Sequence, residues 1–403
     1  MSASSPEPDG KLGRMIQPPQ LRIPGPTPVP DRVQRAMAAP MINHRGPEFK
    51  ALLPELEAGL RWAFQTENDM LIFPASGTGG LESAVANLVS PGERVLAVTI
   101  GAFGDRFADL ASAFGADVAR YTLPWGEAAD PEDLDDLLNR EPDIATVLIT
   151  HNETSTGVTN HLQTLAEVVK RQQRLLVVDG VSSIGSIDVP VDRWGIDVAI
   201  TASQKGWMVP PGVTMVSVSR AAWQRQSTAR SPRFYFDWTR ARTMQAKGMT
   251  FTTPALSIFF GLREALWMMR EEGLPAIFQR HLRVAAAFRA AATALGLRLL
   301  ADPEIASATV TAVYLPQTLQ GDRSEGVFKT WRDLGLVLGE GQSQLSGKIF
   351  RIGHLGAVYE PDVVATVEAL ERGLEANGHP VTRGAALTAA RRALASSEPS
   401  LVA

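Results

Sequence analysis

Short apolar runs alternate with helical patterns over the first half of the chain, and this alternation restricts the fold more than any other feature. Runs rich in β-branched or other large apolar residues occur at residues 69–73, 94–99, 117–122, 145–150, 174–179 and 198–202. Segments with helical periodicity separate most of them. Strands that are apolar almost throughout are buried on both faces, and strands that alternate with helices form a mostly parallel sheet. We therefore expect an α/β domain with a helix-covered sheet.

The pattern changes after about residue 255. Two long helical patterns meet at Gly273. Strand candidates follow around Arg298, at 309–315 and at 348–352, and further helical patterns lie near 323–334 and 361–376. This combination predicts a smaller α+β domain of roughly a hundred residues.

The chain therefore divides into four expected parts. A disordered tail rich in proline, serine and glycine covers residues 1–20, and a large domain covers 21–270. A small C-terminal domain covers 271–380, and a helix rich in alanine and arginine, followed by a tail, covers 381–403.

Composition excludes several classes of function. The net charge is −4 and no basic or acidic run occurs, so nothing indicates binding to nucleic acid or to a membrane surface. No apolar window is long enough to span a membrane, and the N-terminus lacks the layout of a secretory signal, so we expect a cytoplasmic protein. The chain has no cysteine, which excludes disulfides, thiolate metal sites and thiol catalysis. The six histidines show no metal-binding spacing, so we expect no metal site.

A lysine follows the apolar run at 198–202. Ser203 and Gln204 end that run, and Lys205 comes next, before a turn containing Pro210 and Pro211. Catalytic groups in α/β domains sit at the ends of strands. A partly desolvated amine in this position is suited to Schiff-base chemistry.

Three further motifs favour a small-molecule site. The turn Ser76-Gly77-Thr78-Gly79-Gly80 stands between a strand and a helix, where backbone N–H groups bind anions. It is not a Rossmann fingerprint, because Glu82 occupies the third glycine position, and it lacks the ending of a P-loop. A plain tight turn remains the alternative interpretation.

The other two motifs are charged residues in apolar surroundings. Asp179 ends the run at 174–179, and a buried carboxylate there needs a cation, such as a protonated pyridine nitrogen, unless it only caps a helix. Arg351 interrupts the strand pattern of FRIGHLG and has the planar fork that grips a carboxylate, although an edge-strand arginine is an equally good interpretation. Among the histidines, we expect His281 to face solvent and His44 and His354 to lie near the site.

The order of these motifs resembles the fold-type I enzymes that use pyridoxal phosphate. The segments GPTPVP, SGTGGLE, HNETSTGV, VDGVSSIG, SQKGWMVPPG and RIGHLG are similar to those of the class V aminotransferases, in particular the alanine–glyoxylate and serine–glyoxylate (serine–pyruvate) enzymes. The resemblance runs from about residue 21 to about residue 378. It implies transfer of an amino group between serine or alanine and glyoxylate or pyruvate.

The resemblance also implies roles for individual residues. Lys205 is expected to hold the cofactor in a Schiff-base linkage and to carry protons. The residues expected to bind pyridoxal phosphate are Ser76, Gly77, Thr78, Gly79, Phe103, Thr154, Asp179, Ser182, Ser203, Gln204, Lys205 and Thr252. The residues expected to bind substrate are Gly25, His44 and Arg351.

Two positions depart from the family pattern. Phe103 stands where these enzymes usually have the tryptophan that stacks on the cofactor ring, and Met249 stands where a tyrosine reaches the phosphate across a dimer interface. Thr252 is then the expected hydroxyl donor. The shared segment implies a homodimer, in which His44 and Arg45 also come from the partner.

Related activities on the same fold remain as alternatives. Cysteine desulfurases need a cysteine that this chain lacks, and phosphoserine aminotransferases need further basic residues. A pyridoxamine–pyruvate aminotransferase is a closer alternative, although the turn at Ser76–Gly79 favours a bound phosphate. A non-catalytic subunit on this fold is opposed by the presence of Lys205, Asp179 and Arg351 together.

Overall fold

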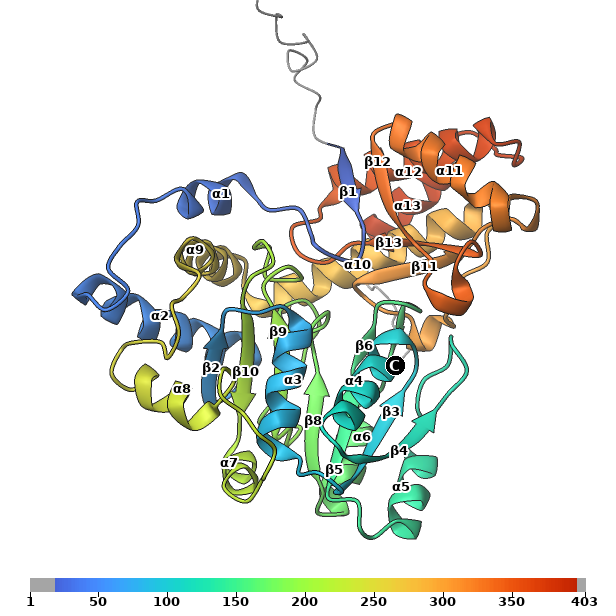
Figure 1. Ribbon diagram of the computed structural model, residues 1–403. Helices are drawn as coiled ribbons and strands as arrows, with labels where there is room; N and C mark the ends of the chain where they lie inside the picture. Colours follow the sequence, from blue (N-terminus) through green and yellow to red (C-terminus); the bar gives the residue numbers. More distant parts are fainter. Residues whose placement is uncertain (1–18, 397–403) are drawn as a thin grey trace, which may run out of the picture.

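The computed structural model describes residues 19–396, which form a seven-stranded sheet and a four-stranded sheet flanked by helices, together with a two-stranded hairpin (Figure 1). The larger sheet has the strand order β2-β10-β9-β8-β5-β3-β4. Its strands are β2 (Asp69–Phe73), β3 (Arg94–Thr99), β4 (Asp117–Thr122), β5 (Thr146–Thr150), β8 (Leu175–Asp179), β9 (Val198–Ala202) and β10 (Thr214–Val218). All pairings are parallel except those of β10, which is antiparallel to both neighbours. The predicted mostly parallel sheet is confirmed.

Successive residues of these strands pack into two different cores, as the near-continuous apolar runs predict. One core lies against α3 (Gly77–Leu88), α4 (Ala102–Ala113), α7 (Arg220–Gln226) and α8 (Trp238–Gln245). The opposite core lies against α2 (Pro47–Phe64), α5 (Pro131–Arg140), α6 (Leu162–Arg171) and α9 (Leu256–Glu272). In β8, for example, Val177 faces the first core and Val178 the second.

The smaller sheet has the order β1-β12-β13-β11. Its strands are β1 (Gln20–Arg22), β11 (Val310–Tyr314), β12 (Leu336–Glu340) and β13 (Ile349–Gly353). It packs with α10 (Leu274–Ala294), α11 (Ser324–Asp333), α12 (Glu360–Ala376) and α13 (Ala385–Ala395). α10 runs from the junction with α9 toward this second sheet (Figure 1).

Several expectations need correction. β1 pairs with β12, so residues 20–22 lie in the second sheet and not with the large domain, whose predicted boundary is residue 21. The strand expected around Arg298 is only an isolated bridge between Leu299 and Val313, whereas β12 was not predicted. The expected helix beyond residue 380 is α13, and it packs in the same core as α10. The division at residues 270 and 380 stays a prediction, and the tail expected at 1–20 lies almost wholly outside the described residues.

Two histidines also depart from expectation. His281 is buried on α10, where its Nδ1 lies 2.7 Å from the Ile277 carbonyl and its Nε2 accepts from Gly356 N, because the loop between β13 and α12 covers that face of the helix. His354 is buried as well, stacked on Phe288 and bonded to the Thr311 hydroxyl. Neither is placed to act on a ligand.

The remaining elements are short. α1 (Asp31–Met37) packs on α9, and β6 (Asn152–Glu153) pairs with β7 (Val158–Thr159) in a hairpin beyond β5. Within residues 19–396, no helix is both long enough and apolar enough to cross a membrane.

The contact between α3 and the large sheet gives a first prediction. A Cβ on Gly80 would lie 2.2 Å from Thr214 Oγ1 and 2.6 Å from Ile200 Cγ2, so α3 can approach β9 and β10 only with glycine there. We expect Gly80→Ala to lower the free energy of unfolding by about 1–3 kcal/mol through overpacking. Chemical denaturation measures it.

Gly326 provides the control for this substitution. It is also a helical glycine, but a Cβ there would meet nothing closer than 4.0 Å. Gly326→Ala is expected to be neutral or to stabilise by up to about 1 kcal/mol. If both substitutions changed the free energy of unfolding equally, the close packing of α3 on β9 and β10 would not be the reason that Gly80 is needed.

Candidate active site

The site lies beyond the carboxyl ends of β8 and β9, where the chain leaves the sheet in polar turns. Asp179 ends β8, and the turn that carries Lys205 joins β9 to β10. The turn is closed by Ser203, whose hydroxyl donates to the Pro210 carbonyl at 2.7 Å and accepts from Val213 N at 3.2 Å. Ser203 therefore shapes the turn itself.

A segment from the N-terminal part of the chain braces the same turn. Thr27 N donates to the Gln204 carbonyl and Thr27 Oγ1 to the Lys205 carbonyl, both at 3.0 Å. Lys205 Nζ donates to the Pro24 carbonyl at 2.8 Å. A Cβ on Gly25 would lie only 2.5 Å from that Nζ, so glycine is required where the predicted substrate-binding residue faces the amine.

Burial is the main influence on the Lys205 amine. Burial, and next the positive charge of Arg351, lower its pKa to about 8, while Asp179 and Glu153 oppose the shift. At neutral pH roughly one tenth of such an amine is unprotonated, far more than for an ordinary lysine. The amine is therefore prepared to act as a nucleophile.

Asp179 carries a buried and incompletely balanced charge. Its Oδ1 accepts from Val181 N at 3.0 Å, and among the described residues it forms no ion pair. Burial raises its pKa to about 6, against the backbone hydrogen bond and the charges of Lys205 and Arg106. A cationic ligand group beside this carboxylate would stabilise its ionised form.

The turn before α3 contacts the segment that follows Asp179. Ser76 is the N-cap of α3, and the N–H groups of Gly77, Thr78 and Gly79 precede the first hydrogen bond of the helix, from Gly80 N to the Ser76 carbonyl. A Cβ on Gly77 would be 2.9 Å from Val181, so glycine lets this turn contact the segment after β8. An anion at the helix N-terminus would thus lie close to Asp179.

Arg351 reaches the site from β13 in the second sheet. Its Nε and Nη2 donate to the Glu340 carbonyl at 2.9 and 2.7 Å, and its Nη1 donates to the Thr154 carbonyl at 2.9 Å. A guanidinium has five N–H donors, so one remains on each of Nη1 and Nη2. Burial lowers the pKa of Arg351 to about 10, and the side chain is still a cation at neutral pH.

Arg106, which the sequence analysis did not identify, contacts both Phe103 and Thr78. The guanidinium of Arg106 lies 4.9 Å from the centre of the Phe103 ring, and its Nη1 is 3.5 Å from Thr78 Oγ1. Beside them opens a cleft of about 880 Å³, whose walls include Arg106 on α4, Trp125 after β4, and Gln344 between β12 and β13.

Ser182 is held by a second unpredicted residue, Asn152. The Ser182 hydroxyl donates to the Asn152 carbonyl at 2.8 Å and accepts from its side-chain amide at 2.7 Å. Asn152 belongs to the motif HNETSTG, whose polar residues are buried together. In the sequence, this run of polar residues directly after an apolar strand could have indicated that Asn152 belongs to the site.

His44 and Thr252 are not brought to Lys205 by the described residues. His44 precedes α2, and its neighbour Arg45 lies 3.9 Å from Met249 Sδ. Thr252 is in the loop before α9, where its carbonyl accepts from Thr250. The two loops thus lie side by side.

Comparison with known proteins identifies the family. Residues 26–322 match the family model of class-V aminotransferases. The chain belongs to the class-V aminotransferase family. A serine–glyoxylate aminotransferase of Methylorubrum extorquens is 39% identical over 92% of this chain and 94% of its own, and an L-aspartate–glyoxylate aminotransferase of Paracoccus denitrificans is 37% identical over the same shares.

A further relative of this class-V aminotransferase has a different name. A protein named as the small subunit of a soluble hydrogenase from Synechococcus is 44% identical over 93% of this chain and 98% of its own. Among solved structures, pyridoxamine–pyruvate aminotransferase from Mesorhizobium loti superposes with a TM-score of 0.89, at 28% identity over 94% of this chain and 98% of its own. The expected fold-type I architecture is confirmed.

Enzymes of this family use pyridoxal phosphate, and the residues present fit that cofactor. Lys205 supplies an amine with a lowered pKa, and Asp179 supplies a buried carboxylate without an ion pair among the described residues. Gln204 Oε1 is buried without a hydrogen-bond partner in the described chain. The N-terminus of α3 presents free N–H groups to an anion. No cluster of three or more potential metal ligands occurs within residues 19–396.

The charges around Lys205 give a second prediction. The neutral amine is the reactive form, so capture of pyridoxal phosphate by the apo-protein should accelerate as pH rises through about 8. Arg351→Ala removes a positive neighbour and should move that midpoint to higher pH. Asp179→Asn removes a negative neighbour and should move it to lower pH. Stopped-flow absorbance, recorded over a range of pH, measures the midpoint for the wild-type protein and for each of the two variants.

The opposite signs of the two shifts are the internal control. Loss of packing alone would move both midpoints in one direction, toward the ordinary lysine value. Midpoints of all three proteins near 10.5 would contradict the assigned environment of Lys205.

Proposed function

We propose that this aminotransferase moves an amino group between a small amino acid, serine or alanine, and a small 2-oxo acid, glyoxylate or pyruvate. The observation that carries the proposal is the fork of Arg351. The three hydrogen bonds to the Glu340 and Thr154 carbonyls orient the guanidinium and leave one N–H on each terminal nitrogen. Two such N–H groups match the two oxygens of one carboxylate.

The charges around Lys205 favour a donor with a single carboxylate. Among the described residues, Arg351 is the cation whose charge acts on the Lys205 amine. Arg106 is engaged with Phe103 and Thr78. Relatives that act on glyoxylate with serine as donor support the same choice.

The proposed cofactor contacts rest on the resemblance to the class V aminotransferases, and the geometry of the site supports them. The phosphate is assigned to the turn Ser76, Gly77, Thr78 and Gly79, with Ser203 and Gln204 nearby. Phe103 would stack on the cofactor ring, and Asp179 would pair with its pyridine nitrogen. Thr154 and Ser182 lie toward the ring oxygen.

Proton handling is assigned to Lys205. When bound, pyridoxal phosphate acts as an electron sink for negative charge at the amino acid Cα. Lys205 Nζ takes and returns the proton of that carbon, and its lowered pKa makes the neutral base available near neutral pH. Arg351 fixes the substrate carboxylate and thereby the position of Cα relative to Nζ.

Two other activities are weighed against this one. Pyridoxamine–pyruvate aminotransferase shares the fold closely, but the free N–H groups before α3 favour a bound phosphate. A role as a hydrogenase subunit is suggested by the names of two relatives. The chain supplies no thiolate for a metal, and it keeps Lys205, Asp179 and Arg351 in one site, which favours an enzyme. A cytoplasmic location stays a prediction.

The substrate proposal is tested by half-reactions of the holoenzyme. Serine and alanine should convert the bound cofactor to its amino form rapidly, followed by absorbance, and glyoxylate or pyruvate should reverse the change. Fast reaction with aspartate or aromatic donors alone would contradict the proposal.

Arg351→Ala is the control for this experiment. It should raise KM for the amino acid by at least about tenfold, since a buried bidentate pair is worth roughly 2–5 kcal/mol. An unchanged KM would mean that another residue holds the carboxylate.

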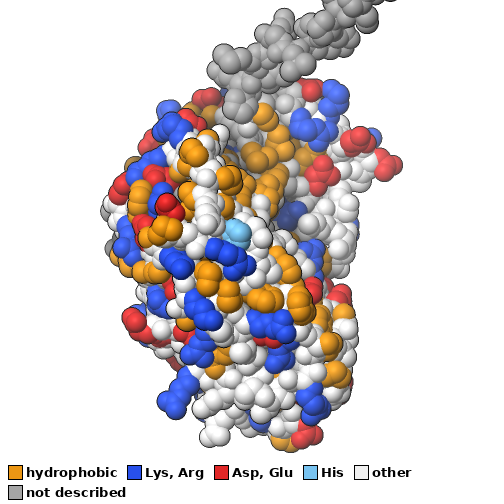
Figure 2. Space-filling model, turned by 60° about the vertical axis from the view of Figure 1, so that its left-hand side comes forward, with side chains coloured by type: hydrophobic (Ala, Val, Ile, Leu, Met, Phe, Trp, Pro, Cys, Tyr) orange, Lys and Arg blue, Asp and Glu red, His pale blue; other side chains and the backbone are white. Residues whose placement is uncertain are grey.

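We also propose a homodimer with shared sites. Phe234 and Tyr235 are 68% and 42% exposed, and their loop contacts the turn before α3, where Tyr235 lies 3.4 Å from the Pro74 carbonyl. Phe251, next to Thr252, packs on Phe234 with ring centres 5.8 Å apart. The face that includes α1, α2 and α8 shows hydrophobic side chains among basic ones (Figure 2). Exposed aromatics beside a ligand site mark an interface.

Light scattering tests the dimer. The wild-type protein should have the mass of two chains, and Phe234→Asp should shift it toward one chain and weaken cofactor binding, because a charge is buried at the interface. Tyr359→Asp is the control, since Tyr359 is 43% exposed but lies at the start of α12. A wild-type mass of one chain would refute the proposal.

A further inference from the structure

Glu153 is a fully buried carboxylate in β6 for which neither the sequence motifs nor the proposed function provides a role. Its exposed fraction is 0%, and it takes part in four hydrogen bonds. Oε2 accepts from Phe103 N and Gly104 N at 3.0 and 3.1 Å. Oε1 accepts from Ser155 N at 3.0 Å and from Ser155 Oγ at 2.6 Å. A buried carboxylate with this many donors is held in one orientation.

The donors on one side are the first N–H groups of α4. Ser155 Oγ extends the contact by accepting from Ala102 N at 3.0 Å, so successive amides of the first turn are all engaged. The negative charge also faces the positive end of the helix dipole. A Cβ on Gly101 would lie 2.5 Å from both Glu153 Cγ and Ser155 Oγ. The backbone before α4 therefore contacts the segment of Glu153 and Ser155 directly, with no room for a side chain at Gly101. The position of Phe103 therefore depends on Glu153.

On the other side of Glu153, the segment that carries it also contacts Arg351 of β13. Thr154, the next residue, offers its carbonyl to Arg351 Nη1 at 2.9 Å. The charge of Glu153 also acts on the site, since it raises the pKa of Arg351 and opposes the lowering of the pKa of Lys205. A single carboxylate thus lies between the aromatic ring on α4 and the guanidinium on β13.

We propose that Glu153 is a positioning residue that aligns the Phe103 ring for cofactor stacking and, through Thr154, the Arg351 fork for the substrate carboxylate. It touches neither cofactor nor substrate in this role. The proposal rests on the proposed function for Arg351 and for the stacking of Phe103, but its cofactor arm concerns pyridoxal phosphate binding alone and does not depend on the substrate assignment.

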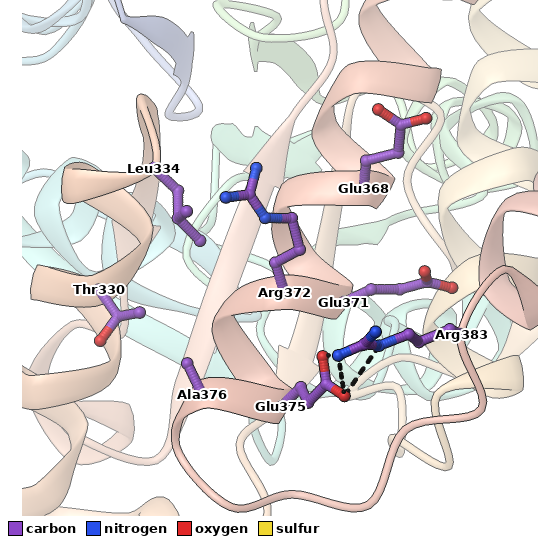
Figure 3. A pocket seen from close by; sticks show the side chains of 8 residues that line it. All are labelled: Thr330, Leu334, Glu368, Glu371, Arg372, Glu375, Ala376 and Arg383. Carbon is purple, nitrogen blue, oxygen red and sulfur yellow. Dashed lines mark hydrogen bonds and ion pairs between the residues drawn. The ribbon is translucent and has the colours of Figure 1, made fainter.

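The experiment compares Glu153→Gln with a matched control, Glu371→Gln. Glu371 is also a buried glutamate whose oxygens accept from two backbone amides at a helix start, Gly384 N and Ala386 N, both at 3.0 Å. It lines a separate cavity of about 690 Å³ between α11 and α12 in the second domain (Figure 3). Both substitutions replace a carboxylate acceptor by an amide, and both should lower the melting temperature.

Only the Glu153 substitution should change the site. We expect Glu153→Gln to weaken pyridoxal phosphate binding by about tenfold, as expected for charge-assisted hydrogen bonds. It should also reduce the visible circular dichroism of the bound cofactor and raise KM for the amino acid more than it lowers kcat. Glu371→Gln should leave all three within about twofold of the wild type.

The outcomes distinguish the proposed positioning role of Glu153 from a purely structural role, in which it only caps the N-terminus of α4. If Glu153→Gln lowers the melting temperature as Glu371→Gln does but leaves cofactor affinity, dichroism and KM unchanged, the proposal is overturned. If Glu153→Gln does not fold, Ser155→Ala replaces it. That substitution removes the bridge to Ala102 and should weaken cofactor binding in the same direction, and an unchanged affinity overturns the proposal. Failure of the substrate assignment would leave the cofactor affinity and the dichroism interpretable.

Discussion

The position of the Lys205 amine depends on one contact between distant parts of the chain, the hydrogen bond from Nζ to the Pro24 carbonyl. The segment that carries Pro24 follows β1, which pairs with β12 of the second sheet. It is confined there, because a Cβ on Gly339 would lie 2.7 Å from Pro24 and one on Gly353 would lie 2.1 Å from the Ile23 carbonyl. The N-terminal strand therefore fixes the second sheet relative to the turn with the lysine.

This arrangement explains how charges can be kept buried at the meeting of two domains. Asp179, Lys205, Glu153 and Arg351 each have a pKa moved by burial toward the neutral form. The charges of Asp179 and Glu153 oppose the shift of Lys205, Glu153 opposes that of Arg351, and Lys205 opposes that of Asp179. Isolated charges of this kind would be costly, and the set is tolerable because positive and negative groups are interleaved. A ligand with a cationic nitrogen, an anionic phosphate and a substrate carboxylate adds the partners that are still lacking.

The sequence predicts the parts of this site that follow from local pattern. β9 was predicted with its observed bounds, and Asp179 and Lys205 lie at strand ends as expected, because an apolar run ended by polar residues determines such a position by itself. The resemblance to class V aminotransferases is confirmed. β1 and β12 were missed because a three-residue strand beside prolines and a strand containing Gly339 have no clear period. Glu153 was missed, and His281 was wrongly expected to face solvent, because each accepts from a backbone amide that only tertiary packing brings near.

Contacts made by the backbone and contacts made by side chains also differ in how they can vary among relatives that share one architecture but accept different donors. The amine, the aspartate and the arginine are held by backbone carbonyls and amides of both domains, so these contacts depend on the fold and little on neighbouring side chains. The cleft beside α4 is different, since its walls are side chains such as Trp125 and Gln344 on loops from the two domains. Substitutions of these wall residues would change the cleft without removing the backbone contacts that hold Lys205 and Arg351. Serine and aspartate donors, named for two relatives of similar identity, are therefore compatible with one catalytic framework.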